Sequence, residues 1–234
     1  MKTIQNILAA VSLAALASTA CARADEGAKV IPAAVMDEQP AGDSETAVLS
    51  GGCFWGMQGV FEHVKGVKKV LAGYAGGAAD TAHYGDVSDG DTGHAESVQI
   101  VYDPHQVTYG QLLRVYFSVA HDPTELNRQG PDDGTQYRSN IWYTNAEQQK
   151  VASAYIAQLG KARVYGAPIV TRVDAFKGFY PAEAYHQDFL IHNPDYPYIV
   201  INDAPKIRNL QRLLPGDYVG APVRVSQITA VKME

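Results

Sequence analysis

The chain has 234 residues, of which 46% are hydrophobic and 19% charged. These proportions are typical of a globular protein, and the length fits one domain with additional segments or at most two small domains. The formal net charge of -6, without any run of Lys and Arg, argues against a nucleic-acid partner. Two cysteines, Cys21 and Cys53, are too few for a disulfide-dense scaffold, a four-thiolate zinc site or a thiolate-held iron–sulfur cluster.

Residues 1–24 have the pattern of a secretory signal peptide. Lys2 precedes an apolar stretch from Ile7 to Ala17, which is too short to span a bilayer, and small residues follow it. Two processing outcomes remain open. Cleavage after Ala22 or Ala24 would give a soluble exported protein, periplasmic or secreted. Alternatively, Cys21 resembles the lipid-modified first residue of a bacterial lipoprotein anchored to the envelope, although Ser18 stands where Leu is expected.

Residues 25–45 are expected to be a flexible linker, because they contain prolines, glycines and scattered acids without a sustained hydrophobic period. Residues 46–234 are expected to form the folded domain. No second apolar run is long enough to cross a membrane.

Hydrophobic periodicity predicts the elements of this domain in chain order. A strand over Thr46–Ser50 is followed by Gly51-Gly52 and by a helix that begins after Cys53 and ends at Gly66. A strand over Val67–Tyr74, a Gly- and Asp-rich loop to Gly93 and a strand over Glu96–Tyr102 are expected next. A helix from a Thr108 cap to Ala120 and a polar loop over His121–Arg138 should then lead to a strand over Asn140–Tyr143. The last expected elements are a helix from an Asn145 cap to Leu159 with Gln148 in the capping box, a strand over Ile169–Phe176 and a helix over Ala182–Ile191.

The order β-α-β-β-α-β predicts an α+β fold, a two-layer ferredoxin-like sandwich with added helices and a loop-rich C-terminal segment.

Cys53 is the main candidate for chemistry. A cysteine that follows a strand and two glycines and opens a helix lies among unpaired N–H groups at the positive end of the helix dipole. We expect that position to lower the thiol pKa and to favour the nucleophilic thiolate. On position alone, a buried and inert cysteine is an equally good interpretation.

A set of motifs resembles the peptide-methionine sulfoxide reductases of the A type. In family order and at family-like spacing over roughly residues 46–205, these are Gly52-Cys53-Phe54-Trp55-Gly56, Gly73-Tyr74-Ala75-Gly76-Gly77, Thr92-Gly93-His94-Ala95-Glu96, His121-Asp122-Pro123-Thr124, Arg128-Gln129-Gly130, Gly134-Thr135-Gln136-Tyr137-Arg138-Ser139 and Ala182-Glu183-Ala184-Tyr185-His186-Gln187. The resemblance implies thiol-dependent reduction of the S epimer of methionine sulfoxide, free or in oxidised client proteins. Protein repair follows from that activity.

The resemblance also implies residue roles. Cys53 matches the nucleophile, which attacks sulfur and becomes a sulfenic acid, and Glu96 matches the acid that protonates the departing oxygen. Near an aromatic wall, Glu96 should have a raised pKa. Four further positions match groups around the substrate: Tyr84 and Tyr137 hold the oxygen, and Phe54 and Trp55 line the pocket for the S-methyl group. Asp132 matches a residue near the site that acts through water, and His186 is expected to be structural.

The sequence departs from the many family members that resolve the sulfenic acid with C-terminal cysteines. There is no cysteine from Asn193 to Glu234. We therefore expect no bound cofactor, no metal and an external thiol reductant: a thioredoxin-fold partner, a glutaredoxin or glutathione. Attack by Cys21 across the linker is the alternative. The oligomeric state is expected to be monomeric.

Three rival functions remain to be weighed. A cysteine-dependent acyl hydrolase would need a histidine base, and His94, His121 and His186 are candidates. A metal-binding protein would have to use residues such as His83 and His94, without any paired-ligand spacing. A binding module for oxidised proteins would keep Cys53 idle.

Overall fold

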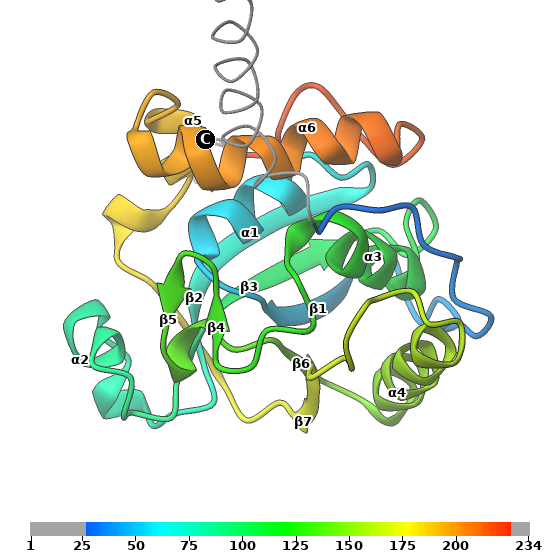
Figure 1. Ribbon diagram of the computed structural model, residues 1–234, viewed down its shortest axis with the longest axis horizontal. Helices are drawn as coiled ribbons and strands as arrows, with labels where there is room; N and C mark the ends of the chain where they lie inside the picture. Colours follow the sequence, from blue (N-terminus) through cyan, green and yellow to red (C-terminus); the bar gives the residue numbers. More distant parts are fainter. Residues whose placement is uncertain (1–26, 226–234) are drawn as a thin grey trace, which may run out of the picture.

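The computed structural model describes residues 27–225, so the expected signal peptide and Cys21 lie outside the described residues. Its centre is a six-stranded sheet with the order β7-β6-β1-β3-β2-β8 (Figure 1). The strands are β1 (Glu45–Ser50), β2 (Val67–Ala75), β3 (Ala95–Tyr102), β6 (Asn140–Tyr143), β7 (Arg172–Ala175) and β8 (Phe179–Pro181). A separate two-stranded ribbon is formed by β4 (Arg128–Gln129) and β5 (Asp132–Asp133).

The four inner strands, β6-β1-β3-β2, pair antiparallel with one another. Helix α1 (Phe54–Glu62) connects β1 to β2. Helix α3 (Tyr109–Val115) and the π-helical turn η2 (Tyr116–Ala120) follow β3 in the chain. The chain then forms the β4–β5 ribbon before it reaches β6. Outside these four, β7 pairs parallel to β6 and β8 pairs antiparallel to β2. The fold is therefore α+β, as expected.

The two faces of the sheet bury different side chains. Ala47 and Leu49 of β1 belong to the large core beneath the helices, whereas Val48 belongs to a small cluster with Trp142 on the opposite face. Because strand side chains alternate, Glu96 lies on the same face of β3 as the core residue Val98. The acid predicted from the sequence therefore faces the helical layer.

The remaining helices surround this sheet. Helix α4 (Ala146–Lys161) packs against α3, and the 3-10 turn η1 (Ala79–Thr81) and helix α2 (Tyr84–Ser88) follow β2. After β8 come η4 (Ala184–His186), α5 (Phe189–His192), the π-helical turn η5 (Ile199–Asp203) and α6 (Ala204–Leu213). Helices α5 and α6 contact α1 and lie across it on the side away from the sheet (Figure 1). No helix within residues 27–225 is long and apolar enough to cross a membrane.

Helix caps explain two of the boundaries predicted from sequence. The Thr108 side chain accepts from the backbone N–H of Gln111 in a full capping box, and Asn145 accepts from Gln148 N–H at 2.8 Å. The Gln148 side chain, however, accepts from Thr144 and does not close the second box.

Several element predictions are wrong in extent. The helix expected over Ala182–Ile191 is broken into η4 and α5, because Asp188 between them has a left-handed φ of 53°. The expected strand over Ile169–Phe176 is paired only from Arg172 to Ala175. Helix α1 ends at Glu62, before Gly66. The expected loops contain η1, α2, the β4–β5 ribbon and the 3-10 turn η3 (Thr135–Tyr137). The described part of the C-terminal segment contains η5 and α6 between loops.

The expectation of a flexible linker is wrong for residues 27–44. Ile31 is 1% exposed in the core, and its carbonyl accepts from Arg114 at 3.0 Å. The carbonyl of Pro32 accepts from the Tyr155 hydroxyl at 2.7 Å, and Asp37 accepts from the N–H of Gly110 at 2.8 Å. The segment has no hydrophobic period because it packs as an irregular strap held by single anchors, which periodicity does not detect.

Candidate active site

Cys53 lies between β1 and α1, at the N-cap of the helix, and its residue is 8% exposed. The turn that brings it there depends on Gly52, which has a φ of +91°. A Cβ at Gly52 would also lie 2.5 Å from Cγ of Gln129 on the ribbon. A glycine at this position therefore supplies both the left-handed backbone and the close approach of the β4–β5 ribbon to the cysteine.

The pKa of the Cys53 thiol is raised well above its ordinary value, contrary to the expectation from its position on the helix. Burial is the main cause, and the carboxylates of Glu96 and Asp203 add to it. The backbone N–H of Trp55 and the ammonium group of Lys206 lower the pKa, but by less. The effect of desolvation on the thiol pKa is therefore larger than the effect of the helix N-terminus.

Glu96 is a buried acid that contacts the N-terminus of α1 next to this thiol. Its Oε2 accepts from the backbone N–H of Phe54 at 2.9 Å, and the residue is 3% exposed. Burial raises the pKa of Glu96 to about 8, and the bond from Phe54 opposes the shift. The raised pKa expected for this carboxyl is thus present, so near pH 7 Glu96 carries the proton that an acid catalyst needs.

An aromatic wall flanks the thiol. Trp55 stacks on Phe189 of α5 with 3.8 Å between ring centroids, and its Nε1–H donates to Nδ1 of His186 at 3.1 Å. Phe54 is 1% exposed and packs against His186 and Tyr74. Trp55 is the half-buried ring that faces the site, whereas Phe54 supports the wall from the core.

The tyrosines and the aspartate predicted from sequence converge on the same place. Burial raises the pKa values of Tyr84 and Tyr137, and Glu96 and Cys53 raise them further. Asp132 also acts on Tyr137, and it accepts a hydrogen bond from the Tyr198 hydroxyl. The structure therefore brings Cys53, Glu96 and these three polar residues together, from β1–α1, β3, α2, the ribbon and η3.

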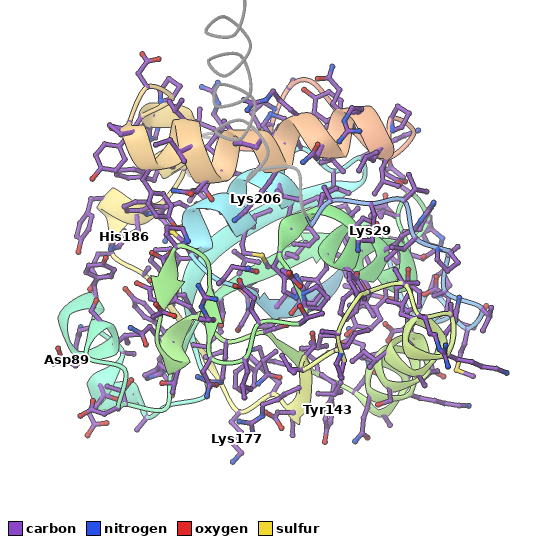
Figure 2. All side chains as sticks on the ribbon, viewed as in Figure 1. Lys29, Asp89, Tyr143, Lys177, His186 and Lys206 are labelled. Atoms are coloured by element: carbon purple, nitrogen blue, oxygen red, sulfur yellow. The ribbon has the colours of Figure 1, made fainter. Side chains whose placement is uncertain are left out.

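Sequence analysis missed three groups of this site, all from the C-terminal segment. Tyr198 contacts Asp132 and makes an edge-on contact with Trp55, with 6.0 Å between ring centroids. Asp203 and Lys206 form an ion pair whose charges reach Cys53. Figure 2 shows Lys206 where α6 lies above α1. The sequence signal that could have located them is the i, i+3 spacing of an acid and a base in a segment with a strong amphipathic pattern.

The histidines are engaged in ways that do not suit a hydrolase. Nδ1 of His94 accepts from Gly77, and Nε2 donates to the Ala78 carbonyl at 2.8 Å. His121 bonds to the Tyr116 carbonyl and to Ser139, and burial lowers its pKa to about 3. His186, visible in Figure 2, accepts from Trp55.

These bonds leave His94 unavailable as a metal ligand. Within residues 27–225, no group of three or more His, Cys, Asp or Glu side chains is arranged to hold a metal ion.

Comparisons with known proteins agree with this geometry. The family model described as peptide methionine sulfoxide reductase matches residues 45–215. Peptide methionine sulfoxide reductase MsrA 2 of Mesorhizobium japonicum is 63% identical over 190 residues, which cover 81% of this chain and 97% of that protein. The MsrA 2 protein of Synechocystis is 53% identical over 188 residues, covering 79% of this chain and 88% of the relative.

Solved structures show the same likeness. Mxr1 of Saccharomyces cerevisiae in reduced form has a TM-score of 0.60 and 31% identity, and the match covers 72% of this chain and 94% of that chain. Methionine sulfoxide reductase A of Corynebacterium diphtheriae has a TM-score of 0.56 and 33% identity, covering 73% and 90%. The chain therefore belongs to the peptide methionine sulfoxide reductase family, of the MsrA type.

Proposed function

We propose that this enzyme reduces the S epimer of methionine sulfoxide, free or in oxidised proteins, with Cys53 as the nucleophile and Glu96 as the acid. Methionine sulfoxide reduction and repair is the activity that its family membership supports. The observation that carries the assignment of roles is the hydrogen bond from Phe54 N–H to Glu96. It fixes a carboxyl with a pKa of about 8 beside the residue that follows the nucleophile.

In the proposed first step, the Cys53 sulfur attacks the sulfoxide sulfur while Glu96 protonates the sulfoxide oxygen. The attack forms a bond between the two sulfurs. This S–S bond and the S–O bond of the substrate then break as the hydroxyl passes to the Cys53 sulfur, and the thioether leaves as methionine. The oxygen is retained on Cys53 as a sulfenic acid, so the cysteine sulfur is oxidised by two electrons and the substrate sulfur is reduced by two. Glu96 is restored by the proton that the thiol gives up.

The other site residues would orient the substrate. We assign the hydroxyls of Tyr84 and Tyr137 to hold the sulfoxide oxygen, since both lie within the fields of Glu96 and Cys53. Trp55 would contact the S-methyl group, with Phe54 packed behind it. Asp132 would act through the hydroxyl of Tyr198, to which it is bonded.

Resolution of the sulfenic acid would use a thiol from outside the chain. Two equivalents of an external thiol would reduce Cys53 to its starting state and release water and a disulfide. A thioredoxin-fold protein, a glutaredoxin or glutathione would serve, because Cys53 is a free thiol and the segment from Asn193 onward contains no cysteine. We infer a monomer without a bound cofactor.

We also propose an exported protein. Residues 1–24 would direct it to the periplasm or the medium, with lipidation of Cys21 as the anchored alternative. The inner strands β6-β1-β3-β2, with crossovers through α1 and α3, support the description of residues 46–234 as a ferredoxin-like sandwich with additions.

Intact mass measurement of the purified exported protein, before and after substrate without reductant, tests the cycle. A sulfenic acid on Cys53 adds about 16 Da, whereas a disulfide with Cys21 removes about 2 Da. A quantitative loss of about 2 Da would contradict the external-thiol proposal. The Cys53→Ser variant should show no mass change and no turnover, and turnover by that variant would contradict the role of Cys53.

A further inference from the structure

A buried ion pair lies one helical turn from the nucleophile. Asp203, the last residue of η5, has a fully buried side chain, and its Oδ1 is 3.1 Å from Nζ of Lys206. The Lys206 side chain is 19% exposed. The pair therefore lies at the edge of the site, with the carboxylate inside and the ammonium group between it and solvent.

The pair occupies a notch in α1 that only a glycine leaves open. A Cβ at Gly56 would lie 2.1 Å from Oδ1 of Asp203 and 2.9 Å from Nζ of Lys206. Gly56 is three residues after Cys53, in the first turn of α1. Since residues three apart lie on the same face of a helix, the ion pair packs on the face of α1 that begins at Cys53.

The incomplete hydrogen bonding of the Asp203 carboxylate indicates that this residue does more than stabilise the fold. Its Oδ2 is buried and, among the residues that the structure describes, has no hydrogen-bond partner. A buried carboxylate with one oxygen unpaired is costly, and hydrophobic residues would fill the same space at less expense. A buried carboxylate of this kind is therefore expected where its charge has a functional role.

Charged and titratable groups reach the Cys53 thiol from every element packed around it. Asp203 raises the pKa of Cys53, and Lys206 lowers it. The other groups around the thiol are Glu96 of β3, Tyr84 of α2, Tyr137 of η3 and Tyr198 before η5. Asp132 of β5 acts on Glu96 and Tyr137 beside them. Among them, Lys206 is the group that supplies positive charge.

We propose that Asp203 and Lys206 are positioning residues for the nucleophile: Asp203 fixes the Lys206 ammonium group over the first turn of α1, where its charge stabilises the Cys53 thiolate. The proposal rests on the proposed function, in which that thiolate attacks the sulfoxide. In this chain the C-terminal segment then contributes a charge to the first step, although it has no cysteine for the second.

The test measures the thiolate directly, with no sulfoxide present. In the full chain with Cys21→Ser, the rate of alkylation by iodoacetamide is followed against pH, and Cys53→Ser supplies the blank. Lys206→Met should move the midpoint up by about one pH unit, which is about tenfold in rate at a fixed pH below it. Asp203→Asn removes a charge that raises the pKa of Cys53 but also frees the ammonium group, so Lys206→Met should shift the midpoint less in the Asp203→Asn background than in the wild type. Lys206→Arg should restore the wild-type midpoint.

Arg208→Met is the matched control, because Arg208 is an exposed base on the same helix. It removes the same charge and should leave the midpoint unchanged. Equal shifts for Lys206→Met and Arg208→Met, or a Lys206→Met shift that is the same with and without Asp203→Asn, would overturn the proposal.

If Lys206→Met does not fold, Lys206→Gln takes its place in both comparisons, and the same outcomes overturn the proposal. Single-turnover reduction of methionine sulfoxide at pH 7 is measured in parallel and should slow in Lys206→Met. Failure of wild-type turnover would contradict the proposed function, whereas unchanged alkylation midpoints would contradict only the role of the ion pair.

Discussion

The backbone N–H of Phe54 donates to Oε2 of Glu96 at 2.9 Å, so the first turn of α1 holds the acid of β3 directly beside Cys53. This contact depends on the carboxyl group of Glu96 and on the register of β3 in the sheet. Glu96 pairs with Tyr74 across the sheet and faces the helical layer, and the helix begins at the residue after the thiol. The backbone therefore places Cys53 and Glu96, the proposed nucleophile and acid, next to each other.

Replacement of Glu96 by Gln should separate thiol reactivity from catalysis. The amide keeps the shape but cannot transfer a proton, so kcat should fall by about 10²–10⁴-fold. Because Glu96 raises the pKa of Cys53, its neutralisation should lower the alkylation midpoint at the same time. Stopped-flow reduction of methionine sulfoxide and iodoacetamide kinetics measure the two effects. A variant that loses both activities together would contradict this assignment.

The pH dependence of the wild type should show the same acid. The reacting form has Glu96 protonated and Cys53 ionised, and Cys53 has the higher pKa. Therefore kcat/KM should rise with pH up to the Glu96 pKa of about 8 and level off above it, because each further gain in thiolate is offset by loss of the Glu96 proton. Glu96→Gln should keep rising above pH 8. A pH–rate profile from 6 to 10 in a constant-ionic-strength buffer measures the difference, and a wild-type profile that keeps rising in parallel with Glu96→Gln up to pH 10 would argue against Glu96 as the proton donor.

The two tyrosines should contribute separately to oxygen binding. Tyr84→Phe and Tyr137→Phe each remove one neutral hydroxyl, so each should lower kcat/KM by about threefold to tenfold, the equivalent of one neutral hydrogen bond. Tyr143→Phe, on a strand that leads away from the site, is the control. Steady-state kinetics on a methionine sulfoxide peptide measures the loss, and wild-type kinetics in both single variants would remove the tyrosines from the mechanism.

Gly56 and Gly160 offer a matched pair of helical glycines. Gly56→Ala would force the Asp203–Lys206 pair out of its notch, and the overpacking should lower the free energy of unfolding by about 1–3 kcal/mol. A Cβ at Gly160 meets nothing within 4 Å, so Gly160→Ala should raise stability by up to about 1 kcal/mol. Urea unfolding of both variants measures the difference. Equal effects at the two sites would mean that the notch around Gly56 is not tight.

Glu62, at the end of α1, should make stability depend on pH. The residue is 1% exposed, and burial, with Asp188, raises its pKa to about 9. The unfolded chain loses this proton near the ordinary value of 4.5, whereas the folded chain keeps it. The unfolded state therefore binds fewer protons between these values, and the free energy of unfolding falls as pH rises, by at most about 1.4 kcal/mol per unit.

Glu62→Gln should accordingly gain stability over the wild type as pH rises from 5 to 9. Thermal unfolding at intervals of one pH unit measures the gain, with Glu147→Gln, an exposed carboxyl of α4, as the control. A difference between Glu62→Gln and wild type that stays constant across this range would contradict the buried, protonated state of Glu62.

Local sequence patterns were sufficient to place the elements with a strong period or a clear cap. β6 spans the residues of the predicted strand, Asn140–Tyr143, and α3 begins after the predicted cap at Thr108. Family motifs also named the residues that the structure gathers around Cys53. These features depend on neighbours within a few positions of the chain, which is the range that periodicity, capping and short motifs describe.

The electrostatics of the site depend on contacts between segments that are distant in the chain. The position of Cys53 at a helix N-terminus predicts a lowered thiol pKa, but burial and the Glu96 and Asp203 carboxylates, which come from β3 and η5, raise it. The packing of residues 27–44 against α3 and the contact of Lys206 with Gly56 likewise join segments far apart in the chain. Desolvation and long-range charge depend on what covers a residue in space, and no local pattern of residues records that.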